Sequence, residues 1–109
     1  MITPATIKNP VTIAETLRIP TRIVPTVGTL LAGATKQFLG RNNRQDRVQF
    51  NLTNMDPTQV LWLQTSNGVN CVPVYPQRTF AIETTADLQL YNPNANPVQY
   101  AVCELYPGT

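Results

Sequence analysis

The side chains of this sequence that could do chemistry are few and far apart. The 109 residues contain no histidine, which removes the commonest general base and metal ligand. Cys71 and Cys103 therefore have no imidazole to activate them, and two cysteines cannot complete a four-ligand zinc site. Glu83 and Asp87 could form a carboxylate pair, but acids in turns and at strand edges are the simpler interpretation. We expect no enzyme, no metal and no cofactor.

Basic residues are concentrated in the first half of the chain. Residues 1–47 hold seven of the eight Lys and Arg and two of the six acids, so the remainder is acidic. Arg41, Arg44 and Arg47 recur every three residues in a polar loop and could contact phosphates, but the flanking Phe38 and Phe50 look like core residues rather than a stacking surface. We interpret these arginines as a basic contact loop for a protein, or as solvated residues, and expect no nucleic-acid partner.

The first 26 residues predict an extended N-terminal arm. Four prolines oppose regular helix, while the apolar residues between them are too numerous for a disordered tail. The arm must bury them against its own body or against a neighbouring subunit. The expected partner-binding residues of the arm are Ile7, Val11, Ile13, Leu17, Arg18, Ile19, Arg22 and Ile23.

Residues 27–109 predict one β-sandwich domain. Arg47 to Thr53 alternates strictly and places Val48, Phe50 and Leu52 on one face. Further strands are predicted over 59–65, 69–74, 77–84, 87–91 and 98–106, with one or two more from 18–39. Asn67-Gly68 marks a hairpin, since both positions tolerate positive φ. The predicted fold class is all-β, a small antiparallel β-sandwich of jelly-roll-like or barrel-like form.

The remaining sequence features concern the compartment. No apolar run approaches the length of a membrane span, and the start lacks the pattern of a secretory signal. We therefore expect synthesis in the host cytoplasm, no membrane partner, and buried free thiols at the two cysteines, with a disulfide as the alternative. Charged residues make up only 13% of the chain, which suits a protein that associates with others.

The stretch from Arg47 to the C-terminus resembles small bacteriophage virion β-sandwich proteins of the capsid decoration, or cement, type. Three features carry the resemblance: the alternating strand 47–54, the proline-containing segment 72–83, and the closing strands that end at Tyr91 and Glu104. The resemblance implies a virion protein that binds the major capsid protein or other virion proteins and stabilises the shell. It also implies a homo-oligomer, with a trimer favoured. The alternative is a carbohydrate- or host-surface-binding module of a phage tail or fibre.

Overall fold

The structure of the chain, a computed structural model, describes residues 20–107. Every regular element in this range is a β-strand, and the range contains no helix that could cross a membrane. The strands are β1 (Pro20–Leu30), β2 (Thr35–Phe38), β3 (Arg41–Asn42), β4 (Gln45–Asp46), β5 (Gln49–Asn54), β6 (Leu61–Thr65), β7 (Asn70–Val74), β8 (Thr79–Ile82), β9 (Leu88–Tyr91) and β10 (Val98–Pro107).

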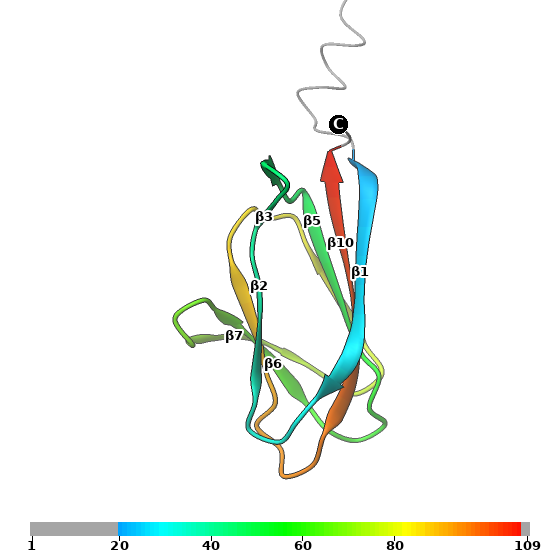
Figure 1. Cartoon of the computed structure of the whole chain (residues 1–109). Helices are drawn as coiled ribbons and strands as arrows, with labels where there is room; N and C mark the ends of the chain where they lie inside the picture. Colours follow the sequence, from blue (N-terminus) through cyan, green and yellow to red (C-terminus); the bar gives the residue numbers. More distant parts are fainter. Residues whose placement is uncertain (1–19, 108–109) are drawn as a thin grey trace, which may run out of the picture.

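Eight of these strands form two antiparallel four-stranded sheets packed face to face (Figure 1). One sheet has the order β1-β10-β5-β8 and the other has the order β2-β9-β6-β7, while β3 and β4 form a separate hairpin. Pairing of the first strand with the last, and of the second with the next to last, is a jelly-roll arrangement. The predicted all-β antiparallel sandwich is confirmed.

Strand β1 begins inside the segment that the sequence predicts as an arm. Residues 20–26 of the predicted arm belong to β1, which pairs along its length with β10. Residues 1–19 lie outside the described residues. The prediction that they form an extended arm therefore stays a prediction.

The core lies between the two sheets and follows the period-2 pattern of the sequence. Phe50 and Leu52 of β5 are fully buried, and Val102 of β10, which is also buried, lies opposite Leu52 in the neighbouring strand. Phe38 closes one side of the core, with its ring in an edge contact 5.4 Å from the ring of Phe50. The alternation that predicted these strands thus also predicted which of their side chains form the core.

The Asn67-Gly68 hairpin forms, but only Gly68 takes a positive φ, of 84°. The Gly68 amide donates to the Thr65 carbonyl, and the Thr65 amide donates to the Val69 carbonyl. This is a tight turn followed by a left-handed glycine. The predicted hairpin between β6 and β7 is therefore present, and Gly68 alone of the two residues uses the left-handed conformation.

Candidate functional site

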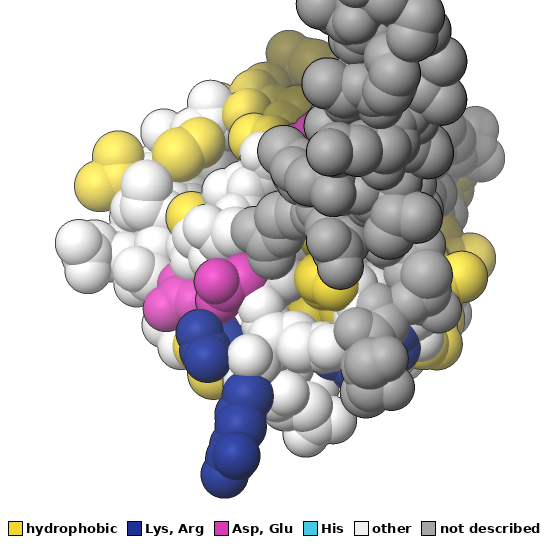
Figure 2. All heavy atoms as spheres, turned by 90° about the horizontal axis from the view of Figure 1, so that it is seen from above, with side chains coloured by type: hydrophobic (Ala, Val, Ile, Leu, Met, Phe, Trp, Pro, Cys, Tyr) yellow, Lys and Arg dark blue, Asp and Glu magenta, His cyan; other side chains and the backbone are white. Residues whose placement is uncertain are grey.

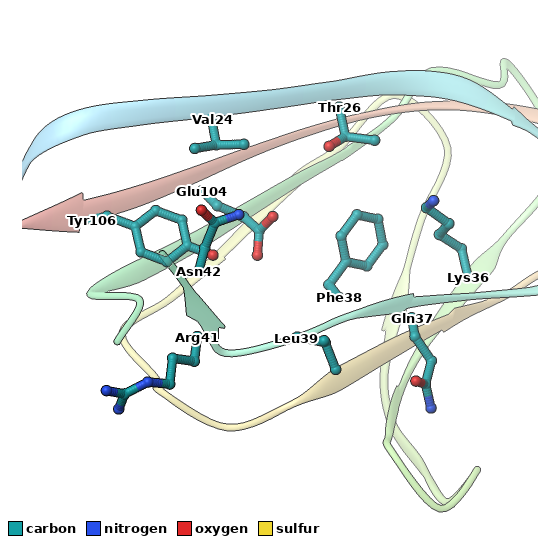
Figure 3. Close-up of a pocket in the computed structure, with 10 residues that line it drawn as sticks. All are labelled: Val24, Thr26, Lys36, Gln37, Phe38, Leu39, Arg41, Asn42, Glu104 and Tyr106. Carbon is teal, nitrogen blue, oxygen red and sulfur yellow. The ribbon is translucent and has the colours of Figure 1, made fainter. Parts of the chain in front are cut away.

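A cleft opens on the side of the sandwich where the two sheets end in β1 and β2. These strands are the outer strands of different sheets, so no backbone ladder closes the gap between them. The cleft has a volume of about 270 Å³ and is lined from β1, β2, β3 and β10. Described residues alone line it, and we take it as the candidate site (Figure 3).

One end of the cleft combines a cation with an aromatic ring. Lys36 and Phe38 alternate with the outward-facing Gln37 in β2, so both rise from β2 towards β1. Val24 and Thr26 of β1 line the opposite wall. Phe38 is only 4% exposed and forms an apolar floor, whereas Lys36 is exposed, with no acidic side chain of residues 20–107 within ion-pair distance.

The other end of the cleft rests on a buried ion pair. The Arg47 guanidinium donates to the Glu104 carboxylate across 2.8 Å, and the two side chains are 0% and 8% exposed. The same guanidinium donates to the backbone carbonyls of Leu39 at 3.3 Å and Thr84 at 3.2 Å, and also to that of Ala86. Among the described residues that line the cleft, Glu104 has the only carboxylate, and Arg47 neutralises it.

Tyr106 stands beside this pair and is 1% exposed. Burial raises the pKa of the Tyr106 phenol, the Glu104 carboxylate raises it further, and the guanidiniums of Arg47 and Arg22 oppose this increase. Arg22 lies over the tyrosine ring at 4.5 Å and donates to Gln45 Oε1 at 3.0 Å. The phenol at this end of the cleft is therefore neutral at ordinary pH.

The residues predicted for the arm fall into two groups. Those at positions 7, 11, 13, 17, 18 and 19 lie outside the described residues. Arg22 and Ile23 are neighbours in β1 and point to opposite sides of the sheet. Arg22 contacts Tyr106 at the end of the cleft, whereas Ile23 is 65% exposed on the outer side. The structure does not place these two side chains on one surface.

The three arginines of the predicted basic contact loop do not share one surface either. Arg41 and Arg44 are exposed in the β3–β4 hairpin, where Arg41 pairs with Asp46 at 3.2 Å and Arg44 adopts a left-handed φ of 64°. Figure 2 looks onto this end of the sandwich and shows basic side chains projecting beside acidic ones. Arg47 cannot join them in a surface contact, because it is wholly buried by its pairing with Glu104.

The two cysteines are unpaired. Cys71 is exposed in β7, contrary to the expectation of two buried thiols, and Cys103 is half-buried on the outer side of β10. Residues 20–107 bring together no group of three or more His, Cys, Asp or Glu side chains, so we assign no metal ligands within this range.

Of the predicted site residues that the structure describes, only Arg41 lines the cleft, and sequence reasoning missed the other lining residues. Glu104 carried a usable signal, since an acid at an inward position of an alternating strand requires a buried partner. Its partner Arg47 lies two residues before the start of β5 and 57 positions before Glu104. No local pattern connects residues so far apart in the sequence. Lys36 carried no signal, because residues 27–40 do not show a clear period.

Comparison with known proteins identifies the fold. No family model matches the sequence, and neither does any curated protein. Among solved structures, the cupin domain of an XRE family transcriptional regulator from Enterobacter cloacae is 15% identical, with a TM-score of 0.59 over 86% of this chain and 87% of that one. A cupin domain from Bordetella pertussis Tohama I is 16% identical, with a TM-score of 0.56 over 80% and 91% of the two chains. A cupin-superfamily sugar phosphate isomerase from Silicibacter pomeroyi is 18% identical, with a TM-score of 0.50 over 78% and 51%.

These neighbours correct the resemblance drawn from the sequence. They are consistently cupin or double-stranded β-helix domains and not phage capsid proteins. The expected capsid decoration role is therefore wrong, as is the alternative of a phage tail or fibre module, and the expected virion location and capsid partner lose their support. The layout of short strands and turns that suggested them is a property of jelly rolls in general, and a fold does not by itself specify a function. At these identities the comparisons show that the chain has a cupin-like β-sandwich fold.

Proposed function

We propose that this chain is a non-catalytic binding domain that takes a small organic anion in the cleft between β1 and β2. The observation that carries the proposal is the placement of Lys36. Its side chain rises from β2 towards β1 beside Phe38, and no acid of residues 20–107 neutralises it. An uncompensated cation beside an apolar floor suits a ligand with one anionic group and one apolar part.

The size and lining of the cleft limit that ligand. Its volume of about 270 Å³ lies just below the range of about 300–1,000 Å³ for pockets that hold drug-sized molecules. Lys36 and the Thr26 hydroxyl can bind the anionic group, while Val24 and Phe38 contact the apolar part. The other cation of the lining, Arg41, is already paired with Asp46 and points away from the cleft. A single anchoring charge therefore favours a small monoanion.

The residues around the cleft support binding rather than catalysis. Solved structures with this fold include both a regulator domain and an isomerase, so the fold does not decide the question. The Glu104 carboxylate is already engaged by the Arg47 guanidinium, and the raised pKa of the Tyr106 phenol keeps that phenol protonated at ordinary pH. The sequence contains no histidine to act as a proton acceptor.

The test is an NMR titration of the ¹⁵N-labelled protein with benzoate and, separately, with inorganic phosphate. We expect benzoate to shift the amide resonances of Thr26, Lys36 and Phe38, because it has both an anionic and an apolar part. Lys36→Gln should weaken this binding about tenfold, equivalent to the loss of about 1.4 kcal/mol.

Arg78→Gln is the matched control. Arg78 is an exposed cation next to β8, at the opposite edge of its sheet from β1, and its removal changes the net charge equally. Binding of benzoate should survive this substitution. If neither probe shifts the cleft resonances, or if both variants weaken binding equally, the proposed anion site is wrong. A response to phosphate alone would show an anion site without the apolar selectivity and would contradict the role given to Phe38.

A further inference from the structure

The residues that point outwards within the strands of the β1-β10-β5-β8 sheet carry no charge. Side chains that alternate with the buried ones point outwards from this sheet. They are Ile23, Pro25, Val27 and Thr29 from β1, Gln99, Ala101, Cys103 and Leu105 from β10, Gln49, Asn51 and Thr53 from β5, and Thr79 and Ala81 from β8. We call this surface the uncharged face.

The β1 and β10 half of the uncharged face is apolar. Ile23 and Val27 are 65% and 72% exposed, the highest values among the large apolar side chains of the described residues. The register places Ile23 opposite Leu105 and Val27 opposite Ala101. Pro25 and Cys103 lie opposite each other between these two pairs, so the six side chains form one continuous strip. Apolar patches of this kind on a surface mark contact sites.

We propose that two copies of this chain associate through the uncharged face, in a twofold contact of sheet against sheet. If a partner surface carried a charge, binding would bury that charge against the uncharged face, which offers no opposite charge to pair with it. An identical copy presents no charge either, so the two faces can meet without repulsion. The proposal concerns a surface outside the cleft and does not depend on the proposed anion site.

The edge of β1 argues for a face-to-face contact rather than for pairing of strands. Pro25 lies in the middle of this outer strand. Proline cannot donate to a ladder and typically blunts an exposed sheet edge. The sheet therefore resists extension by another strand, while its outer surface stays available. A twofold contact of this kind produces a dimer, not the trimer favoured from the sequence.

The other outer face of the sandwich fits self-association less well. Gln89 donates to Gln64 across 2.8 Å, and Gln64 donates to Asn70 across 2.7 Å. The side-chain amides of Gln89, Gln64 and Asn70 form some of their hydrogen bonds with one another, and this part of the surface remains polar. Trp62, on the same face, is already half-buried. The apolar side chains left most exposed are those of β1.

The area of the uncharged face determines how strongly two copies are expected to associate. Four strands cover about 20 Å, and the outward residues extend about 20 Å along them, giving roughly 400 Å² per copy. A standard stable interface buries about 800 Å² per partner. We therefore expect a reversible, concentration-dependent dimer.

The test combines light scattering after gel filtration with sedimentation over a wide range of concentrations. We expect the wild-type protein to shift from monomer to dimer, and Val27→Lys to weaken association at least about tenfold. Val69→Lys is the matched control, because Val69 is 60% exposed at the tip of the β6–β7 hairpin, away from the uncharged face. It should associate as the wild type does.

Cys103 provides an independent readout, since it lies near the middle of the uncharged face. In a Cys71→Ser background, a short bismaleimide should link two copies through Cys103, and Val27→Lys should abolish the link. A wild type that stays monomeric at every concentration, or equal effects of Val27→Lys and Val69→Lys, would overturn the proposal. An oligomer that forms without the Cys103 link would also overturn it, because another surface would then be in contact.

Discussion

The Arg47 guanidinium and the Glu104 carboxylate meet at 2.8 Å between the two sheets, although 57 positions separate them in the sequence. Glu104 belongs to β10, while Arg47 stands just before β5 and also holds the carbonyls of Leu39 and Thr84. The pair therefore connects the last strand with the segments that flank the cleft. Each of the two buried charges therefore has an opposite charge beside it, which is the condition for burying a charge in a protein interior.

Glu104→Gln should destabilise the fold strongly. The substitution keeps the shape of the side chain but leaves the buried Arg47 charge without its counter-charge, at an expected loss of about 3–5 kcal/mol in the free energy of unfolding. Urea denaturation followed by circular dichroism measures this loss. Arg41→Gln, which removes a partner from the exposed Arg41–Asp46 pair, should cost less than about 1 kcal/mol. Similar losses for both variants would show that the buried pair has no special role.

The sequence predicts those parts of the fold that depend on local pattern. Strict alternation identified Phe50 and Leu52 as core positions, and the structure buries both. The direction of Lys36 could not be predicted, because it depends on the register of β2 against β9, which places Lys36 opposite Leu90. Only that long-range pairing decides whether residue 36 or residue 37 faces the cleft.

The function was harder to predict than the fold, for a physical reason. The turns and alternating strands between residues 47 and 106 report that two sheets pack together, and the same pattern serves unrelated jelly rolls. Features that distinguish one from another are single side chains between or outside the sheets. Here these are Lys36 in the cleft, which has no acidic partner among residues 20–107, and the exposed Ile23 and Val27 on the uncharged face.

Asn92→Ala should destabilise the turn that joins β9 to β10. The Asn92 side chain is fully buried, and it donates to the carbonyls of Leu30 and Asn96, each at 2.9 Å. Its own oxygen accepts from the Asn94 amide. Removing the amide leaves these groups without partners, at an expected loss of about 2–4 kcal/mol in the free energy of unfolding by chemical denaturation. Asn67→Ala, at an exposed hairpin position, should change stability by less than about 0.5 kcal/mol; an equal change would contradict the role of Asn92.

Gly40 and Gly33 should respond differently to the same substitution. A Cβ at Gly40 would lie 1.8 Å from the backbone oxygen of Thr85, an atom that cannot rotate away. Gly40→Ala should therefore cost about 3 kcal/mol or more, or prevent folding. Gly33 has open space around it but a φ of 71°, so Gly33→Ala should cost only about 1 kcal/mol through backbone strain. Thermal melting by circular dichroism compares the two, and a milder effect at Gly40 would contradict the close approach to Thr85.

The buried tyrosines should make the fold less stable at alkaline pH. Burial raises the pKa of Tyr100 and of Tyr106 above the ordinary value of 10.0, and the Glu104 carboxylate adds to the effect at Tyr106. Because the folded state holds these protons more tightly than the unfolded state, the stabilisation is complete below pH 10 and is lost as the pH rises through the folded-state values. Urea denaturation at increasing pH should show this decline, and Tyr106→Phe should reduce its slope, since one of the two protons is no longer linked to folding. Tyr75→Phe, at a ring that is 58% exposed, should retain the wild-type decline. If Tyr106→Phe left the decline of stability with pH unchanged, the Tyr106 phenol would not lose its proton on unfolding. The placement of this phenol in a buried site beside Glu104 would then be wrong.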